Sequence, residues 1–159
     1  MYDLREQKGI YKGRVGECMA KLVDPGIVLT CMAGSEKYLA ACQNNITTEH
    51  YSFLRKHWTS IDAVRRGPDN TIIIYEIKLR VKYRKMKPEW KTNITWSSYN
   101  VYKEAIKLGL AVKILTIWML DDWDYEIEIR NFKYADYTVS KPREFDWYRR
   151  EKPRGNNDK

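Results

Sequence analysis

The sequence predicts a single α/β domain with a central mixed β-sheet and flanking helices. Its 159 residues are about the length of one ordinary domain. Segments with helical spacing of apolar residues alternate along the chain with short, strand-like apolar runs. Helices that alternate with strands usually cover the faces of a mixed sheet. We expect residues 1–140 to form this domain and residues 141–159 to form a basic, partly disordered tail.

The first predicted element is a helix over residues 14–24. Apolar residues recur there at positions i, i+3, i+4, i+7 and i+8, which is the spacing of an amphipathic helix. The members of this stripe are Val15, Cys18, Met19, Leu22 and Val23. A Pro-Gly pair follows the stripe and ends the helix.

Three segments between this helix and residue 57 differ in pattern. Residues 27–33 form a short apolar run with β-branched members, which favours a buried strand. Residues 36–43 then favour a short helix. Residues 44–57 are polar and aromatic without a clear period, so we expect irregular structure there.

A β-hairpin is the best-defined unit of the sequence. Residues 58–66 and 71–80 have the composition of strands, and the four residues between them are strong turn formers. These are Gly67, Pro68, Asp69 and Asn70. The hairpin therefore brings residues from two segments of the chain into one part of the sheet.

The second half of the domain predicts one helix and two strands. An apolar face that includes Val101, Tyr102 and Ala105 indicates a helix over residues 94–108, and a glycine ends it. Residues 111–120 have the pattern of a buried strand. Residues 125–132 alternate between apolar and charged side chains, as a half-exposed strand does.

The charge and the cysteine usage indicate the class of partner and the compartment. Lys and Arg outnumber Asp and Glu by 29 to 21, which gives a net charge of +8 and favours polyanions. Three widely spaced cysteines build neither a disulfide framework nor a zinc site. No apolar run is long enough to span a membrane, and the polar first residues do not resemble a secretory signal. We expect a soluble, cytoplasmic protein without membrane contact.

Three charged residues of the hairpin are candidates for chemistry. Glu76 and Lys78 alternate with Ile77 on one strand, so both side chains point to the same side. Their strand is apolar on both faces, and an unpartnered charge in its interior costs on the order of several kcal/mol. Asp62 lies on the neighbouring strand and meets Glu76 if the register allows it.

Two carboxylates that converge at the end of a sheet form a natural Mg²⁺ site, because Mg²⁺ prefers oxygen ligands. The cation polarises a phosphodiester and activates water, while a lysine stabilises charge on the phosphate oxygens. We therefore predict that Asp62 and Glu76 bind Mg²⁺, for which Mn²⁺ substitutes, and that Lys78 assists the attacking water. The alternative is structural: Glu76 and Lys78 form a charge pair on an edge strand, and Asp62 is a surface residue.

The same residues resemble the catalytic core of the PD-(D/E)XK nuclease superfamily. The resemblance rests on residues 60–64, Ser-Ile-Asp-Ala-Val, followed by a turn and by residues 72–78, Ile-Ile-Ile-Tyr-Glu-Ile-Lys. Within the superfamily, the nearest likeness is to the archaeal Holliday-junction resolvases. Their basic-Gly-x-x-x-Glu pattern is similar to residues 12–17, and their last helix and buried strand are similar to residues 109–115. The resemblance covers about residues 11–24 and 58–132.

This resemblance implies a restriction-endonuclease-like core and an archaeal or viral source. It implies that Asp62 and Glu76 are metal ligands, that Lys78 is the catalytic lysine and that Glu17 is a further carboxylate of the metal site. On a helical wheel Glu17 lies opposite the apolar stripe, so another helix face must pack on the sheet to bring it to the site. Residues 26–57 form an insertion relative to compact resolvases. The helix after Lys78 also lacks the glutamine that many relatives have there.

A basic segment next to the proposed metal site predicts nucleic-acid binding. Basic side chains neutralise phosphates, and the aromatic residues among them can stack on bases. The members of this segment are Arg80, Lys82, Arg84, Lys85, Lys87 and Lys91, and Arg65 and Arg66 on the hairpin add to the same field. A solvated basic loop is the alternative. No base-reading motif is visible, so we expect little sequence specificity.

The sequence thus predicts a Mg²⁺-dependent DNA endonuclease. A dimeric resolvase that cuts four-way junctions is the alternative within the same class, and a homodimer would follow from it. A second alternative is a non-catalytic nucleic-acid-binding protein on a nuclease fold. RNA also remains open as the bound polymer, because no residue visibly tests for a 2′-hydroxyl.

Overall fold

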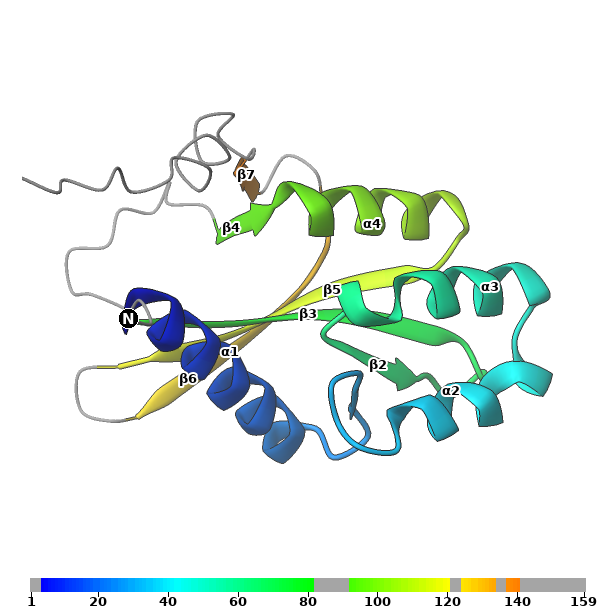
Figure 1. The fold of residues 1–159 in the computed structure, drawn as a ribbon, viewed down its shortest axis with the longest axis horizontal. Coiled ribbons are helices and arrows are strands. Elements are labelled where there is room, and N and C mark those ends of the chain that lie inside the picture. Colours follow the sequence, from blue (N-terminus) through cyan, green and yellow to red (C-terminus); the bar gives the residue numbers. More distant parts are fainter. Residues whose placement is uncertain (1–3, 82–91, 121–123, 134–136, 141–159) are drawn as a thin grey trace, which may run out of the picture.

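A five-stranded mixed sheet forms the centre of the molecule (Figure 1). The computed structural model describes residues 4–81, 92–120, 124–133 and 137–140. The helices are α1 (Leu4–Val23), α2 (Ser35–Cys42), α3 (Thr48–His57) and α4 (Trp96–Lys107), with short 3-10 turns at Gln43–Asn45 and Trp58–Ser60. The strands are β1 (Val28–Leu29), β2 (Ala63–Arg66), β3 (Ile72–Val81), β4 (Thr92–Thr95), β5 (Ala111–Met119), β6 (Tyr125–Asn131) and β7 (Tyr137–Ser140).

The strand order of the sheet is β1-β2-β3-β5-β6. Strands β3 and β5 run parallel, with α4 in the connection between them, and the other neighbours in the sheet are antiparallel. Strands β4 and β7 form a separate parallel pair. These observations confirm the predicted α/β class, with one domain and a central mixed sheet that helices flank.

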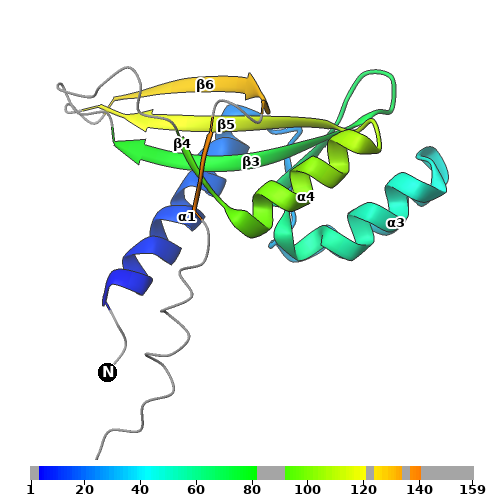
Figure 2. The ribbon, with the colours of Figure 1, turned by 90° about the horizontal axis from the view of Figure 1, so that it is seen from above.

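The two faces of the sheet carry different helices. Helices α1 and α4 lie on opposite sides of it (Figure 1). Turned to the view of Figure 2, α3 and α4 lie toward one end of the sheet and α1 toward the other. On β3, Ile72 and Ile74 join the core under α3 and α4, whereas Tyr75 and Ile77 join the core under α1. The alternation of side chains along one apolar strand therefore supplies both cores.

Helix α1 packs on the sheet mainly through small residues, and Met19 is the member of the predicted apolar stripe that packs against the same core. Gly16 and Ala20 are buried against the sheet, while Leu22 of the predicted stripe is 82% exposed. A Cβ atom at Gly16 would lie 3.2 Å from Cβ of Leu79 on β3, so the backbones approach closely there. The prediction of the buried face was therefore only partly right, because a pattern of hydrophobic residues does not reveal a close contact made by glycine and alanine. The helix also begins at Leu4, ten residues before the predicted start at Arg14.

The segment that was expected to be an insertion contains a helix that the sequence pattern did not reveal. The predicted strand at residues 27–33 is reduced to Val28–Leu29, and the predicted short helix is close to α2. Helix α3 occupies residues that were predicted to be irregular. Thr47 caps the start of α3 by accepting a hydrogen bond from the amide of His50, at 3.1 Å. Phe53 and Leu54 are the residues of this helix that are buried.

The predicted hairpin is confirmed, but its first strand is shorter than predicted, because residues 58–60 form a 3-10 turn and β2 begins at Ala63. The helix and the two strands predicted after it are also present. Strands β2 and β3 pair antiparallel, and Asn70 takes the left-handed conformation in the turn between them, with φ 58°. Helix α4 begins at Trp96, two residues after the predicted start, because Thr95 caps it by accepting a hydrogen bond from the amide of Ser98. Strands β5 and β6 match the two predicted strands to within a residue. The predicted tail lies outside the described residues.

None of the helices in the described ranges combines the length and the apolar character that crossing a membrane requires.

Candidate active site

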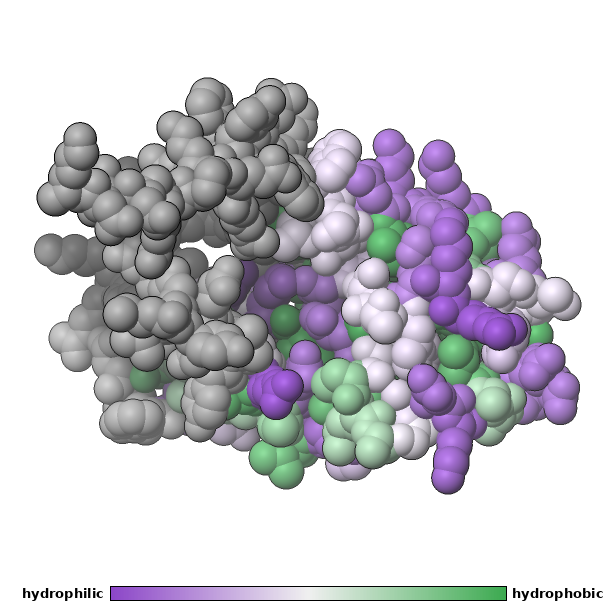
Figure 3. Space-filling view, viewed as in Figure 1, coloured by the Kyte–Doolittle hydropathy of each residue, from purple (hydrophilic) through white to green (hydrophobic). Residues whose placement is uncertain are grey.

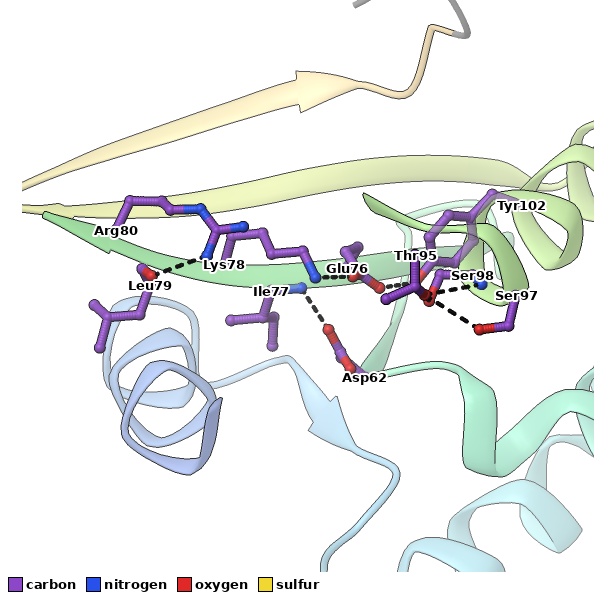
Figure 4. A network of polar contacts seen from close by, with 10 residues as sticks. All are labelled: Asp62, Glu76, Ile77, Lys78, Leu79, Arg80, Thr95, Ser97, Ser98 and Tyr102. Carbon is purple, nitrogen blue, oxygen red and sulfur yellow. Dashed lines mark hydrogen bonds and ion pairs between the residues drawn. The ribbon is translucent and has the colours of Figure 1, made fainter. Parts of the chain in front are cut away.

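Asp62 stands at the point where β2 begins. Its carboxylate accepts a hydrogen bond from the backbone amide of Ile77 on β3, with 2.8 Å between Oδ2 and N (Figure 4). On its other side, the amide of Thr30 donates to the carbonyl of Asp62 over 3.1 Å. Ala63 pairs with Tyr75, so continuing this register by one residue brings Asp62 beside Glu76. Strand β3 thus holds the carboxylate of Asp62, and the segment at Thr30 holds its backbone from the other side.

Glu76 is buried, with only 3% of its surface exposed, and both of its carboxylate oxygens have partners. Lys78, from the same face of β3, forms an ion pair with Oε1. The hydroxyl of Tyr102 on α4 donates a hydrogen bond to Oε2 (Figure 4). The alternation of side chains along β3 therefore places Lys78 beside Glu76, and helix α4, which covers this face, places Tyr102 there.

The burial of the two carboxyl groups changes their acidity. The pKa of Glu76 is raised to about 7, chiefly by burial and also by the nearby charge of Asp62, while Lys78 opposes the shift. Burial also raises the pKa of Asp62, against the Ile77 amide and the charge of Lys78, which both lower it. Perturbed carboxyl groups that share a lysine are typical of functional sites, although structural networks also produce them.

Glu17 lies on α1 next to Gly16, where the helix touches β3. Its carboxylate accepts a hydrogen bond from the thiol of Cys31, with 2.9 Å between Sγ and Oε2. Burial raises the pKa of this thiol to about 11, and Glu17 adds to the shift. No hydrogen bond or ion pair joins Glu17 to Asp62 or Glu76. Within the described ranges, no group of three or more His, Cys, Asp and Glu side chains could hold a metal ion.

Tyr102 is the contact of this site that sequence analysis missed. The helical pattern placed it on an apolar face, and it is fully buried there. A buried tyrosine hydroxyl usually needs a polar partner, and this requirement is the signal that could have identified it. Thr95, Ser97 and Ser98 surround the start of the same helix, where the hydroxyls of Thr95 and Ser98 lie 2.9 Å apart (Figure 4).

The three predicted basic residues that the structure describes, Arg65, Arg66 and Arg80, do not lie together at one end of β3. Arg80 follows Lys78 on the same face, where burial lowers its pKa and Glu76 opposes that shift. Arg66 pairs with Ile72 across the hairpin, so it lies eight positions from Arg80, about 26 Å along a strand. Arg65 forms an ion pair with Asp24, and Arg66 donates to the thiol sulfur of Cys42. The remaining predicted members, Lys82, Arg84, Lys85, Lys87 and Lys91, lie outside the described residues.

The surface shown in Figure 3 is mostly hydrophilic over α3 and α4, and apolar side chains form small separate patches on it. No family model, curated protein or solved structure matches this chain.

Proposed function

We propose that this chain is a metal-dependent DNA nuclease of the PD-(D/E)XK type with little sequence specificity. The observation that carries the proposal is the convergence of Asp62, Glu76 and Lys78 on one side of the sheet. Placing a carboxylate and a lysine in the interior is often no more stable than apolar packing, so such a cluster suggests a chemical role. The net charge of +8 supports a polyanionic substrate.

The residues present fit a divalent cation such as Mg²⁺. Asp62 and Glu76 offer oxygen ligands, and Mg²⁺ is commonly held by one or two carboxylates together with waters and substrate phosphate. When bound, the cation would polarise the phosphodiester and lower the pKa of water. Glu17 would join these ligands only after a rearrangement, because its carboxylate is engaged by Cys31.

The other residues of the site would orient the reacting groups. Tyr102 holds Glu76 through a hydroxyl that is locked in the core, so it acts as a positioning residue. Lys78 is tied to Glu76 in this structure, and its ammonium would stabilise negative charge on the phosphate. Arg80, one step further along the same face, would add a phosphate contact.

A second candidate function is nucleic-acid binding without catalysis. What favours it is the closure of the cluster: both oxygens of Glu76 are occupied by the protein's own groups. The same arrangement is expected of a structural charge network that binds no cation, in a protein that uses its basic surface only to bind nucleic acid.

Cleavage assays with matched variants test the proposal. Linear duplex, single-stranded and four-way-junction DNA would each be incubated with Mg²⁺ and the wild type, Glu76→Gln or Asp62→Asn. Glu49→Gln, which changes an exposed glutamate of α3, serves as the control. We expect both site variants to lose cleavage and the control to retain it. Cleavage of the junction alone, at paired positions, would identify a resolvase.

If the wild type binds DNA but cuts none of the three substrates with Mg²⁺ or Mn²⁺, the binding function replaces the nuclease. Equal cleavage by the wild type and Glu76→Gln would place the active site elsewhere. Competition with a matched RNA distinguishes the two polymers. A DNA-specific protein keeps its labelled DNA when an excess of this RNA is added, whereas a protein that binds both releases it.

A further inference from the structure

Strand β6 carries a row of exposed apolar side chains, which we call the β6 stripe. Its members are Tyr125, Ile127 and Ile129, which are 47%, 38% and 48% exposed. They alternate with Glu126, Glu128 and Arg130 on the other face of the strand. Scattered apolar residues are ordinary on a protein surface, but three in register on one strand form a continuous apolar surface.

The β6 stripe continues the core face of the sheet beyond the helix that covers it. Ile129 pairs with Leu115 and Ile127 pairs with Ile117 on β5. Leu115 and Ile117 are fully buried in the core under α1. The same face is therefore apolar over two strands, and the half on β6 remains open to solvent.

The outer edge of β6 is not paired with any other strand of the described residues. In the strand order of the described sheet, β6 is the last member, and it is seven residues long. A strand edge of that length presents backbone donors and acceptors that favour another strand. Together, the open edge and the apolar row are suited to the addition of a strand.

We propose that a second copy of this chain occupies this edge, with β6 antiparallel to β6 of the partner around a two-fold axis at Glu128. In this register Ile127 faces Ile129 of the partner subunit, and Ile129 faces Ile127 of the partner subunit. Glu126 faces Arg130 of the partner subunit, so opposite charges meet twice. This single antiparallel pairing covers the apolar side chains, brings opposite charges together and gives the backbone groups of the edge hydrogen-bond partners.

Alternative registers are less complementary. Centring the pairing at Ile127 would oppose Glu126 to a second Glu128, and centring it at Ile129 would oppose Ile127 to an asparagine. In the proposed register the two Glu128 side chains meet at the axis, but each also accepts from Trp118 and forms an ion pair with Arg130 of its own chain. Directly opposed unlike charges stabilise a strand pair, whereas like charges destabilise it.

The chemistry of β6 also argues against nucleic acid as its occupant. The strand has two glutamates and one arginine, so it is acidic within a chain of net charge +8. A polyanion would be repelled from it. A two-fold partner instead meets its own surface, which is the self-complementarity that an isologous interface requires.

Pairing of this kind places both Glu76 sites on the same face of one continuous sheet. Glu76 is in register with Ile114 on β5, which is in register with Arg130 on β6. Five inter-strand steps therefore separate the two sites across the sheet, about 24 Å without twist, and the register offsets them by four residues, about 13 Å, along the strands. This geometry is independent of whether the sites cleave DNA.

Sedimentation equilibrium of the full chain tests the association. We expect the wild type to have twice the chain mass of 19.0 kDa and Ile127→Asp to have the chain mass alone. Leu22→Asp changes an exposed apolar residue outside the β6 stripe and should keep the dimer. A monomeric wild type at every concentration up to the solubility limit, or a dimer that tolerates Ile127→Asp, would overturn the proposal.

Disulfide trapping tests the register and does not depend on the Ile127 variant folding. With Cys18 and Cys31 replaced by serine, Glu128→Cys should give a covalent dimer on mild oxidation, because residues at the axis are about 5 Å apart between Cα atoms. Glu126→Cys should not, because the two positions would lie about 13 Å apart along the strands. Crosslinking at position 126 in preference to 128 would contradict the proposed axis.

Discussion

Glu76 is the residue whose environment has the largest energetic consequence. Burial raises the pKa of its carboxyl group from 4.5 to about 7. The folded state therefore binds this proton more tightly than the unfolded state does. The resulting stabilisation is fully present below about pH 4.5, the ordinary pKa of the group, and is lost as the pH rises through about 7.

The first prediction follows from this sign. Without divalent cations, the wild type should lose stability relative to Glu76→Gln between pH 5 and pH 8, by up to about 3 kcal/mol, since one pKa unit corresponds to about 1.4 kcal/mol. Urea unfolding of both proteins across this range measures the difference. Parallel stability profiles would show that Glu76 does not titrate in this window.

The second prediction concerns Tyr102. Tyr102→Phe keeps the ring in the core but leaves Oε2 of Glu76 without its donor. We expect a loss of about 1–3 kcal/mol in the free energy of unfolding, because a buried acceptor loses its partner. Tyr51→Phe, which removes the hydroxyl of a half-buried tyrosine on α3, serves as the control. A purely packing role for Tyr102 would leave the pH dependence of stability unchanged, whereas a positioning role shifts it.

At the scale of the elements, the packing of α1 depends on the absence of a side chain at one position. A methyl group at Gly16 would press on β3 at Leu79, whereas Gly13 has no atom within 4 Å of such a group. Both positions are helical, so alanine should gain about the same helix propensity at each.

The third prediction compares these two glycines. Gly16→Ala should be less stable than Gly13→Ala by at least about 1 kcal/mol, because crowding at a packed contact offsets the helical gain. Thermal unfolding of the two variants gives the comparison directly. If both are stabilised equally, α1 does not depend on the close approach at Leu79.

The elements that sequence analysis predicted are those that local patterns define. The hairpin combines a strong turn with two strand-like runs, and its register brings Asp62 to the strand of Glu76. Helix α3 escaped prediction because its core residues, Phe53 and Leu54, are adjacent and give no long helical stripe. The buried face of α1 depends on a tertiary contact of Gly16. The partnership of Glu76 with Tyr102 joins residues 26 positions apart, which no local period reveals.

At the scale of the whole molecule, two of the described arginines lie far apart along the sheet. Arg80 lies on the side of the candidate active site, while Arg65 is tied to Asp24 near the hairpin turn. A nucleic acid that reaches the carboxylates would therefore contact Arg80 and not Arg65.

The fourth prediction uses this separation. Arg80→Gln should weaken duplex binding and reduce the salt dependence of the affinity by about one counterion, whereas Arg65→Gln should change neither. Fluorescence anisotropy at several salt concentrations measures both quantities. A larger effect at Arg65 would indicate that the polymer follows the hairpin turn instead.

The closed arrangement around Glu76 also bears on how the protein matures. Because Lys78 and Tyr102 each contact the carboxyl group of Glu76, both of its oxygens have partners within the protein, and we expect the chain to fold without an added ion. Many small metal-binding domains collapse when a chelator removes their ion, since binding and folding are one event in them. Under the proposed nuclease function, synthesis and activation would therefore be separate events: the protein could be made, stored and purified in chelator, and the supply of cation would determine when it begins to act.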